Sequence, residues 1–568
     1  MAGAIDILRR YWGYDDFRGI QREIIDSICE GRDTLGLMPT GGGKSITFQV
    51  PALMMEGVCL VVTPLIALMK DQVIHLTKKG ILAKAIYSGM RHEDVVQTLE
   101  DAIYGGVKIL YVSPERLSSE IFLAKIQHVD INIITVDEAH CICQWGYDFR
   151  PSYLEIAKIR DLHPKAPVLA LTATATKKVV KDIQEKLCFR QENVFRMSFE
   201  RKNLSYVVRN SQDKSSQLLH ILSSVAGSAI VYVHTRKHSA EVAKELCEAG
   251  VTTTFFHAGL DNIEKDARQK QWQNNEVRVM VATNAFGMGI DKPDVRLVIH
   301  YDVPDSVEAY FQEAGRAGRD GEKAYAVLMH NNHDVSKLKK RIHDTYPEKD
   351  FIRQIYEQIA CFYQIAVYDG EGCVFEFNIE KFCNIYRHFP VLVDSALAIL
   401  QRAGYIAYEA DYNNRSRFRF TVEKEHLYRL DTDSQMCNDI IMFMLRKYPG
   451  LFSEYQYIEE PLIAGALGLQ EHQVYLILKY LNTINVASYI PKRSVPYIIY
   501  TRDRVETSDV VLSPEVYDDR KKDYESRINS MIEYISNDDV CRSRQLLQYF
   551  GEKMSRNCGG CDVCASRK

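Results

Sequence analysis

The chain has 568 residues, of which 46% are hydrophobic and 26% charged, and its formal net charge is -4 at pH 7. This length exceeds what one hydrophobic core supports and predicts about three to five domains. The acidic balance excludes a surface that is basic throughout, so any nucleic-acid contact must come from a local patch. No apolar run approaches the roughly 18 residues that span a bilayer, and the N-terminus lacks the layout of a secretory signal. We therefore expect a soluble, cytoplasmic protein with no membrane partner.

In the first 200 residues, short apolar runs alternate with amphipathic helical stretches, which is the pattern of a parallel sheet with helical crossovers. Strands are expected at Cys59–Thr63, Lys108–Ser113, Asn132–Val136 and Val168–Leu171. The pattern restarts after Asn203, with strands expected at Ala229–His234, Thr252–His257, Val277–Ala282, Val295–Tyr301 and Ala324–Met329. We predict an α/β fold with two parallel-sheet domains in tandem, at residues 1–203 and 204–345.

From about residue 345 helical segments dominate, and two hairpins are expected. The first joins Tyr405–Glu409 to Arg415–Phe420, and the second joins Ala487–Ile490 to Val495–Thr501. Each hairpin follows helical segments, which is typical of winged helices. We therefore predict winged-helix-like segments at 346–430 and 431–520, followed by a small metal-binding module at 521–568.

Three arginines alternate along one predicted strand. Arg415, Arg417 and Arg419 point to one side, and Lys492-Arg493 occupies the turn of the other hairpin. These cations form either a DNA-facing wing or a solvated strand face, and the paired placement slightly favours the wing.

A glycine-rich segment, Met38-Pro39-Thr40-Gly41-Gly42-Gly43-Lys44-Ser45, lies between an apolar strand and a helix. Glycines let backbone N–H groups surround a phosphate chain, and the helix N-terminus favours its negative charge. Lys44 would reach the β- and γ-phosphates, and the Ser45 hydroxyl would bind Mg²⁺. A glycine-rich turn with a surface lysine is the weaker alternative, so the segment predicts a nucleotide site.

The buried run Ile133–Val136 ends in two adjacent carboxylates, Asp137 and Glu138. Ligands of parallel sheets lie at the carboxyl ends of the strands. Asp137 can therefore hold the Mg²⁺ shell, and Glu138 can orient or deprotonate an attacking water. The polar start of a helix would look similar in sequence. The carboxylate pair, however, comes about 90 residues after the phosphate loop, and this position favours a catalytic role.

Two arginines follow in the second domain, within Gln312-Glu313-Ala314-Gly315-Arg316-Ala317-Gly318-Arg319. Their spacing places both on one helix face. Guanidinium groups are planar and always charged, which suits a γ-phosphate. Arg319, and secondarily Arg316, are predicted to stabilise phosphoryl transfer, whereas without the other motifs a solvated basic helix would be preferred.

Together these segments resemble a superfamily 2 helicase with a DEAH-type box, and the details are similar to the RecQ family of ATP-dependent DNA helicases. Other segments that carry the resemblance are Gly13-Tyr14, Phe17-Arg18, Gln21, Val62–Leu65, Ser113–Leu117, Leu171–Ala175 and Ala282–Pro293. The resemblance implies two RecA-like domains with ATP between them, and Tyr14, Arg18 and Gln21 around adenine. It places Thr40, Gly41, Gly42, Gly43, Lys44, Ser45, Asp137 and Gln312 at the nucleotide.

The segment Ala139–Pro151 is similar to the aromatic-rich loop that connects ATP hydrolysis to single-stranded DNA in RecQ-type enzymes. Trp145 and Phe149 can stack on bases of any identity, and Arg150 can meet a phosphate or carboxylate. Cys143 and Tyr147 replace the family's usual Ser and His. The resemblance also assigns DNA contacts to Thr63, Pro64 and Arg116.

Four cysteines, Cys541, Cys558, Cys561 and Cys564, form a C-x16-C-x2-C-x2-C pattern. Thiolates at this spacing can close a tetrahedral Zn²⁺ site, and an iron–sulfur cluster is an alternative. The surrounding residues resemble the RecQ zinc-binding domain, which favours zinc. In the family this module directly follows the helicase core, whereas roughly 190 residues intervene here.

The resemblance implies a DNA helicase that moves 3′-to-5′ and acts in recombination and repair. Implied partners are single-stranded DNA, tailed or branched duplexes, and single-strand-binding or repair proteins; a bacterial protein would associate with the nucleoid. An RNA helicase, a translocase that moves on duplex without unwinding it, and a winged-helix DNA-binding regulator with a vestigial ATPase remain as alternatives. Lys44, Asp137, Glu138 and Arg319 are all intact, which argues against the regulator.

Overall fold

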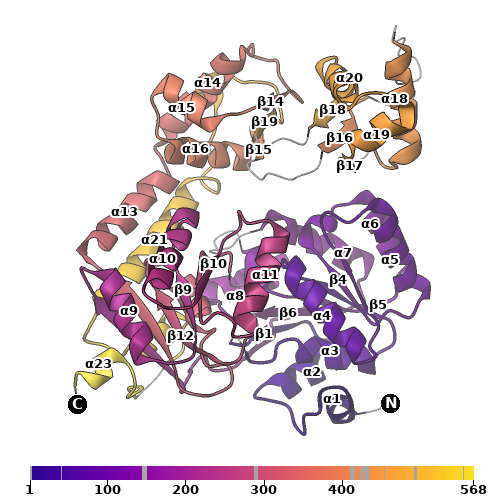
Figure 1. Cartoon of the computed structure of the whole chain (residues 1–568). Helices are drawn as coiled ribbons and strands as arrows, with labels where there is room; N and C mark the ends of the chain where they lie inside the picture. Colours follow the sequence, from indigo (N-terminus) through magenta and orange to yellow (C-terminus); the bar gives the residue numbers. More distant parts are fainter. Residues whose placement is uncertain are drawn as a thin grey trace. The chain divides into compact units, whose positions relative to one another are not determined.

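The computed structural model describes residues 3–39, 41–143, 150–286, 292–409, 416–422, 427, 434–452, 455–491, 496–553 and 556–567. The chain divides into two compact units. The first comprises Met1–Leu338 and Ser526–Lys568, and the second comprises Lys339–Glu525 (Figure 1). Among the described residues, no helix combines the length and the apolar character that a membrane span requires.

The first unit begins with a seven-stranded sheet in the order β3-β4-β2-β5-β6-β1-β7. Its strands are β1 (Thr34–Leu37), β2 (Val58–Val62), β3 (Ala83–Ile86), β4 (Ile109–Val112), β5 (Ile131–Val136), β6 (Val168–Thr172) and β7 (Val194–Arg196). Its helices are α1 (Ala4–Trp12), α2 (Gln21–Cys29), α3 (Ile46–Met54), α4 (Ile66–Lys78), α5 (His92–Tyr104), α6 (Glu120–Ile126), α7 (Ile156–Leu162) and α8 (Lys177–Lys186). All the pairings are parallel, and the central strands are buried along their whole length because helices cover the sheet.

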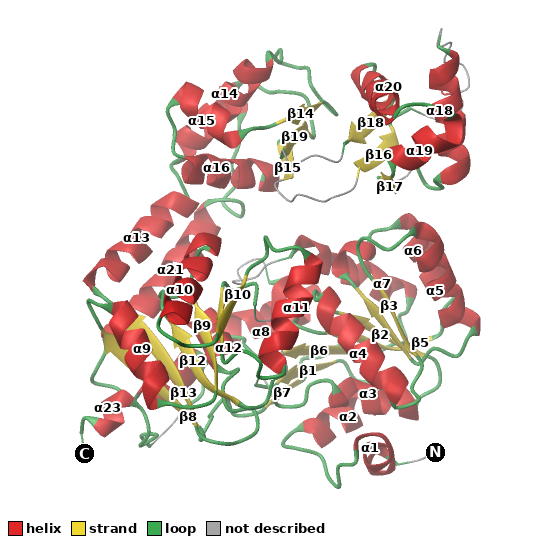
Figure 2. Cartoon of the chain, in the orientation of Figure 1, coloured by secondary structure: helices red, strands yellow, loops and turns green. Residues whose placement is uncertain are grey.

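A second parallel sheet follows in the order β10-β11-β9-β12-β13-β8. Its strands are β8 (Leu204–Asn210), β9 (Ser228–Tyr232), β10 (Thr253–Phe256), β11 (Val279–Ala282), β12 (Val295–His300) and β13 (Ala324–His330). The helices are α9 (Lys214–Ser224), α10 (Arg236–Glu248), α11 (Asn262–Gln273), α12 (Val307–Ala314) and α13 (Asn332–Thr345). Figure 2 shows these strands and helices in contrasting colours. The predicted pair of parallel-sheet α/β domains is therefore confirmed.

The C-terminal part of the first unit packs on this second sheet. It contains the end of α21 (Asp518–Ser536), then α22 (Arg542–Tyr549) and α23 (Asp562–Ala565). The N–H of Val208, in edge strand β8, donates to the Asp562 carboxylate at 3.0 Å. The Phe550 ring lies 5.0 Å from Phe311 of α12. The four cysteines are thus held against the second α/β domain.

The second unit has two hydrophobic cores. Its helices are α14 (Lys349–Tyr363), α15 (Ile379–Tyr386), α16 (Pro390–Arg402), α18 (Gln435–Lys447), α19 (Glu460–Leu467) and α20 (Glu471–Thr483). Its strands are β14 (Val374–Glu376), β15 (Ile406–Glu409), β16 (Ser416–Phe420), β17 (Gln456–Ile458), β18 (Ala487–Ile490) and β19 (Tyr497–Tyr500). They form two antiparallel sheets, β14-β19-β15 and β17-β16-β18.

Both predicted hairpins are wrong. Strand β15 pairs with β19, not with β16, and β16 pairs with β18 and β17. The prediction assumed that strands close in sequence pair with each other, but here each strand finds its partner across a long stretch of chain. Arg415, the turn residues 411–414 and Lys492-Arg493 lie outside the described residues.

The two hydrophobic cores show the same nesting in sequence as the strand pairs. The outer core, which includes Tyr346, Leu400, Tyr405, Ile498 and Leu512, uses residues from both ends of the unit. The inserted core runs from Phe418 to Tyr489 and lies between those ends in sequence. The division of 346–520 at residue 430 remains a prediction, and the pairing of β15 with β19 argues for a nested division in its place.

Candidate functional site

The glycine-rich segment forms the connection between β1 and α3, at the carboxyl end of its strand. Gly41 and Gly43 have φ values of +82° and +75°, which a side chain would disfavour. A Cβ atom at Gly43 would also overlap the Gln21 amide. Glycines at these positions leave the backbone of the turn open to the close approach of an anion, as a phosphate site requires. Thr40 lies outside the described residues.

The predicted adenine residues are connected to this loop. The Gln21 side-chain amide donates to the carbonyl oxygens of Gly42 at 3.2 Å and Gly43 at 3.0 Å. Its oxygen accepts from the Arg18 N–H at 2.9 Å. The Arg18 guanidinium lies 5.4 Å from the ring centroid of Tyr14, which is 46% exposed. An exposed ring beside a cation suits stacking on a base, and Gln21 connects it to the phosphate end of the site.

The two carboxylates lie where β5 ends. Lys44 Nζ is 3.4 Å from a Glu138 carboxylate oxygen, and the Thr63 hydroxyl is 3.4 Å from an Asp137 oxygen. Burial raises the pKa of Asp137, although the Lys44 ammonium opposes this. Burial acts the same way on Glu138, but Lys44, His140 and Arg316 together hold its pKa below the ordinary value. Glu138 is thus held as an anion beside Asp137, the arrangement needed to accept a proton or hold water.

The sequence predicts no role for His140, but in the structure this side chain lies between a carboxylate and a strand end. Its Nδ1 is 2.9 Å from the Thr172 hydroxyl and 3.4 Å from a Glu138 oxygen. Thr172 ends β6, within Leu171–Ala175, one of the segments that carry the resemblance to the RecQ family. His140 therefore connects the carboxylate to a neighbouring strand end.

The second α/β domain supplies the arginines. A Cβ atom at Gly41 would lie 3.5 Å from Cγ of Arg319, so Arg319 lies against the phosphate loop. Arg316 is 4% exposed and close enough to Glu138 to lower its pKa. Gln312 is 9% exposed on α12, which ends before Arg316. The prediction that both arginines lie on one helix face is therefore wrong, because a glycine ends the helix and the arginines lie in the turns that follow. Cations from one domain thus meet the phosphate loop and carboxylates of the other.

Only some of the predicted DNA-contacting residues lie within the described part of the chain. Trp145 and Phe149 lie outside the described residues. The Arg150 N–H donates to the Cys141 carbonyl oxygen at 2.9 Å, which fixes the end of that loop. Arg116 donates to the carbonyl oxygens of Tyr87 and Met90, each at 3.2 Å. Thr63 is buried beside Asp137 and precedes Pro64 in the loop after β2. The DNA roles of Thr63, Pro64, Arg116 and Arg150 stay predictions.

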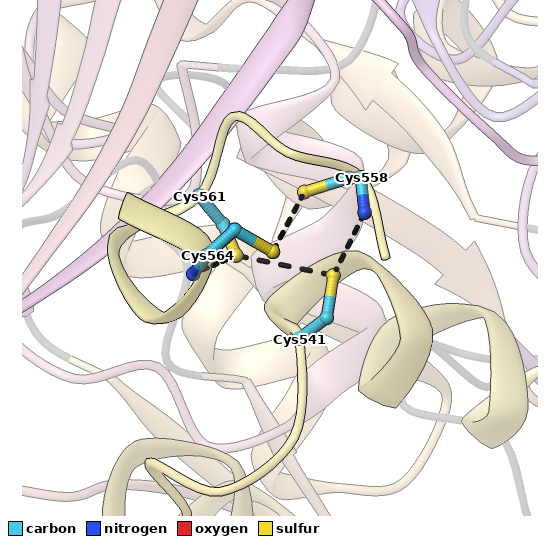
Figure 3. A group of neighbouring side chains, drawn as sticks. All are labelled: Cys541, Cys558, Cys561 and Cys564. Carbon is cyan, nitrogen blue, oxygen red and sulfur yellow. Dashed lines mark hydrogen bonds between the residues drawn. The ribbon is translucent and has the colours of Figure 1, made fainter. Parts of the chain in front are cut away.

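The four cysteines converge on one point (Figure 3). Their sulfur atoms all lie within 4.8 Å of one another, and the Cys558–Cys564 and Cys541–Cys561 pairs are 3.9 Å apart. Four sulfurs about 2.3 Å from one zinc ion lie about 3.8 Å apart in a tetrahedron. Backbone N–H groups of Cys558 and Cys564 donate to two of the sulfurs, which favours thiolates. The residues present therefore fit a single tetrahedral zinc ion.

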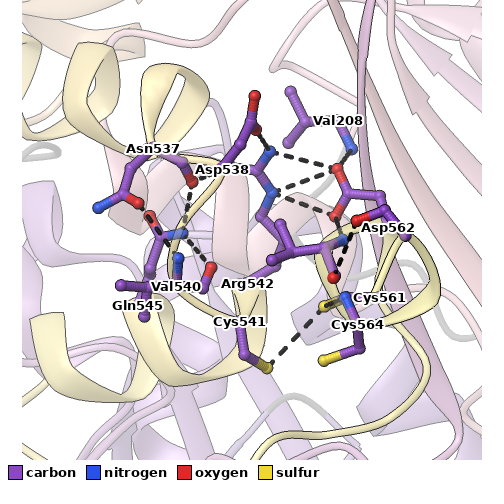
Figure 4. A network of polar contacts seen from close by, with 12 residues as sticks. Val208, Asn537, Asp538, Val540, Cys541, Arg542, Gln545, Cys561, Asp562 and Cys564 are labelled. Carbon is purple, nitrogen blue, oxygen red and sulfur yellow. Dashed lines mark hydrogen bonds and ion pairs between the residues drawn. The ribbon is translucent and has the colours of Figure 1, made fainter. Parts of the chain in front are cut away.

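Arg542 fixes the frame of this site (Figure 4). It is 1% exposed, and its guanidinium donates to the Asp562 carboxylate at 3.1 Å and to the Tyr534 carbonyl oxygen at 2.6 Å. Asp562 in turn accepts from Val208. The same ion pair thus holds the two cysteine segments together and joins them to β8.

Four protein-family models match the chain in sequence order. They are "DEAD/DEAH box helicase" at 18–183, "Helicase conserved C-terminal domain" at 213–321, "RecQ helicase winged-helix domain, Bacteroidota" at 418–491 and "RecQ zinc-binding" at 501–565. The chain belongs to the RecQ helicase family. The RecQ zinc-binding match covers all four cysteines and, with their geometry, makes this a zinc site of the family and disfavours an iron–sulfur cluster.

The relatives agree with this RecQ membership. The "ATP-dependent DNA helicase RecQ" of Pasteurella multocida (strain Pm70) is 41% identical over 338 residues, which is 59% of this chain and 54% of that protein. The protein of the same name from Bacillus subtilis (strain 168) is 42% identical over 335 residues, 58% of this chain and 57% of the relative. The alignments thus span only a little more than half the length of these curated relatives.

A solved structure also resembles this RecQ-family chain. The structure described as "DUF1998 helicase MrfA bound to DNA" aligns with a TM-score of 0.50 and 16% identity, over 58% of this chain and 52% of that one. At this identity the likeness concerns the fold alone, and it agrees with the two parallel-sheet domains. ATP, Mg²⁺ and Zn²⁺ are the cofactors of the family, and the phosphate loop, the carboxylates and the cysteines fit them.

Proposed function

We propose that this protein is an ATP-dependent DNA helicase. The observation that carries the proposal is the meeting of Arg319 with the phosphate loop, beside the Lys44–Glu138 pair. Side chains from two RecA-like domains then surround one nucleotide, so hydrolysis can change how the domains close. RecQ membership supports DNA as the track.

Each site residue has a proposed role. Tyr14, Arg18 and Gln21 hold adenine, and the glycines of the loop with Lys44 hold the phosphates. Ser45 and Asp137 hold Mg²⁺, which when bound neutralises phosphate charge. Glu138 orients water and takes its proton, and Arg319, with Arg316, stabilises the charge that develops on the transferred phosphoryl group. Gln312 contacts the nucleotide from α12.

The proposed track is one strand of DNA, along which the protein moves 3′-to-5′ and separates a tailed or branched duplex. Trp145 and Phe149 stack on bases, while Thr63, Pro64, Arg116 and Arg150 contact the strand near them. We further propose that the protein acts in recombination and repair and that it contacts single-strand-binding or repair proteins. Its proposed location is the cytoplasm, at the nucleoid if the source is bacterial.

The test is ATP hydrolysis by the purified protein with single-stranded DNA, with RNA and with neither. We expect strong stimulation by DNA and its loss in Glu138→Gln, by about 10²–10⁴-fold for removal of a general base. Unwinding is then measured on 3′-tailed and 5′-tailed duplexes. Stimulation by RNA alone would make the protein an RNA helicase, and hydrolysis without unwinding would make it a duplex translocase. No hydrolysis in any condition would favour the DNA-binding regulator.

A further inference from the structure

The segment that carries both arginines is held through its backbone. Gly315 follows helix α12, and Arg316 and Arg319 come directly afterwards. Arg201, from the chain between the two α/β domains, donates to three carbonyl oxygens of this segment. The acceptors are Gly315 at 3.2 Å, Ala317 at 2.9 Å and Gly318 at 2.8 Å. Two of these residues flank Arg316, and the third precedes Arg319, so one guanidinium fixes the peptide groups around both.

Asn203 adds further hydrogen bonds to the backbone of the same segment. Its amide donates to the carbonyl oxygens of Gly318 at 2.7 Å and Glu322 at 2.9 Å, and its oxygen lies 3.4 Å from Arg201 Nε. Gly318 has a φ of +61°, and a Cβ atom there would lie 2.6 Å from the Asn203 amide. The close approach therefore needs glycine at 318, and it fixes the turn that leads into Arg319.

The chain that presents Arg201 is itself fixed. The N–H of Phe199 donates to the Glu552 carboxylate at 3.0 Å, and the Ser198 hydroxyl donates to the same group at 2.5 Å. The Phe199 ring lies 5.4 Å from Phe550 and 6.0 Å from Phe311 of α12. On the other side, the Met197 N–H donates to Leu37 of β1 at 2.9 Å. Arg201 therefore projects from a short segment anchored at several points.

We propose that Arg201 and Asn203 are positioning residues that hold Arg316 and Arg319 in place for phosphoryl transfer. This inference rests on the proposed function. Both side chains act on backbone carbonyl oxygens of the turns that follow α12, from Gly315 to Glu322. A planar guanidinium can bond three carbonyls at once, whereas a lysine ammonium lacks that fixed fork. Small misplacements of a catalytic group cost rate more than binding, so the effect should fall on the transition state.

The test compares Arg201→Gln with wild type in binding ADP and ADP with aluminium fluoride, which mimics the phosphoryl group in transfer. We expect affinity for the fluoride complex to fall by about tenfold or more, and ADP affinity by less than about twofold. In a background with both Arg316→Ala and Arg319→Ala, Arg201→Gln should weaken the fluoride complex no further, because the two arginines that Arg201 positions are then absent. Arg209→Gln, an exposed arginine of β8, is the matched control and should behave as wild type.

Arg201→Lys keeps the charge but not the fork, and we expect it to resemble Arg201→Gln. Asn203→Ala leaves Arg201 intact and serves if Arg201→Gln does not fold; the same selective loss is expected, but smaller. Unchanged affinity for the fluoride complex would overturn the inference. So would an equal loss for ADP with a lower melting temperature, which would mark general destabilisation. If wild type itself hydrolyses no ATP, the proposed function fails instead, because this comparison measures binding alone.

Discussion

The two units of the chain differ in how their strands find partners. In the first unit, parallel strands are joined by helical crossovers, and the proposed phosphate and Mg²⁺ residues lie in loops after β1 and β5. In the second unit, β15 and β19 pair although residues 410–496 lie between them. The difference shows that a contiguous motif can define a nucleotide site. An inserted domain, in contrast, places strands that pair in space far apart in the sequence.

Loss of the cation that joins the two α/β domains should have the largest effect. Arg319→Ala should lower the turnover number for ATP by about 10³-fold or more, as expected for an arginine that stabilises phosphoryl transfer. Steady-state hydrolysis with saturating DNA measures it, with Arg209→Ala as the exposed control. A decrease of less than tenfold would mean that the first unit does not form its site across the two domains.

Removal of one zinc ligand should affect stability next most strongly. Cys561→Ser leaves three thiolates, so bound zinc should fall and the melting temperature should decrease by about 10 °C or more. Metal analysis and a thermal melt measure both quantities. Cys188→Ser, at an exposed cysteine, should change neither. Full zinc occupancy in Cys561→Ser would show that the four-cysteine cluster does not bind the metal.

Excision of the inserted core should have a small effect on thermal stability, because the strands on either side of the excised segment pair with each other. Glu409 and Tyr497 are paired in register, so an Asn-Gly turn can replace residues 410–496 and close β15 onto β19. We expect the melting temperature of the remaining protein to stay within about 5 °C, since insertions at such sites are tolerated. Circular dichroism during heating measures it.

Partial excision provides the matched control. Removing only residues 434–491 leaves β16 without its partners β17 and β18, and this variant should aggregate or melt earlier. If both excisions destabilise the chain equally, the inserted core is not an independent part of the second unit.

The smallest effect expected is a change of stability with pH in the first unit. His238 donates a hydrogen bond to the Asp302 carboxylate at 3.0 Å, and this bond raises the pKa of His238. Glu241 and Glu245 act in the same direction, while burial opposes them. The pair therefore stabilises the folded state fully below about pH 6.5, the ordinary histidine pKa, and this contribution disappears as pH rises through the raised value.

His238→Gln should accordingly lower the free energy of unfolding at pH 6 and leave it nearly unchanged at pH 9. Urea denaturation at the two pH values measures this, with His220→Gln as the control at an exposed histidine. An equal loss at both pH values would assign the effect to packing and not to charge.

The sequence predicted the parts that depend on local order. Asp137 and Glu138 directly follow one buried strand, and Lys44 lies in the loop after another, so their convergence follows from parallel-sheet geometry. The spacing of the cysteines likewise predicted their cluster. The partners of β15 and β16 could not be predicted, because antiparallel strands can pair at any separation and the local hairpin was the simplest choice. Arg201 carries no pattern, since its role depends on carbonyl groups more than a hundred residues away.

The nested second unit also has a consequence for protein synthesis. A ribosome makes β15 first and must add residues 410–496 before β19 emerges. At about 5–20 residues per second, several seconds pass in which β15 lacks its neighbour. The inserted core, from Phe418 to Tyr489, is complete before that neighbour exists. The inserted core is therefore able to fold on the nascent chain before the outer core is complete. During this time the unpaired edge of β15 is the part that a chaperone would need to shield.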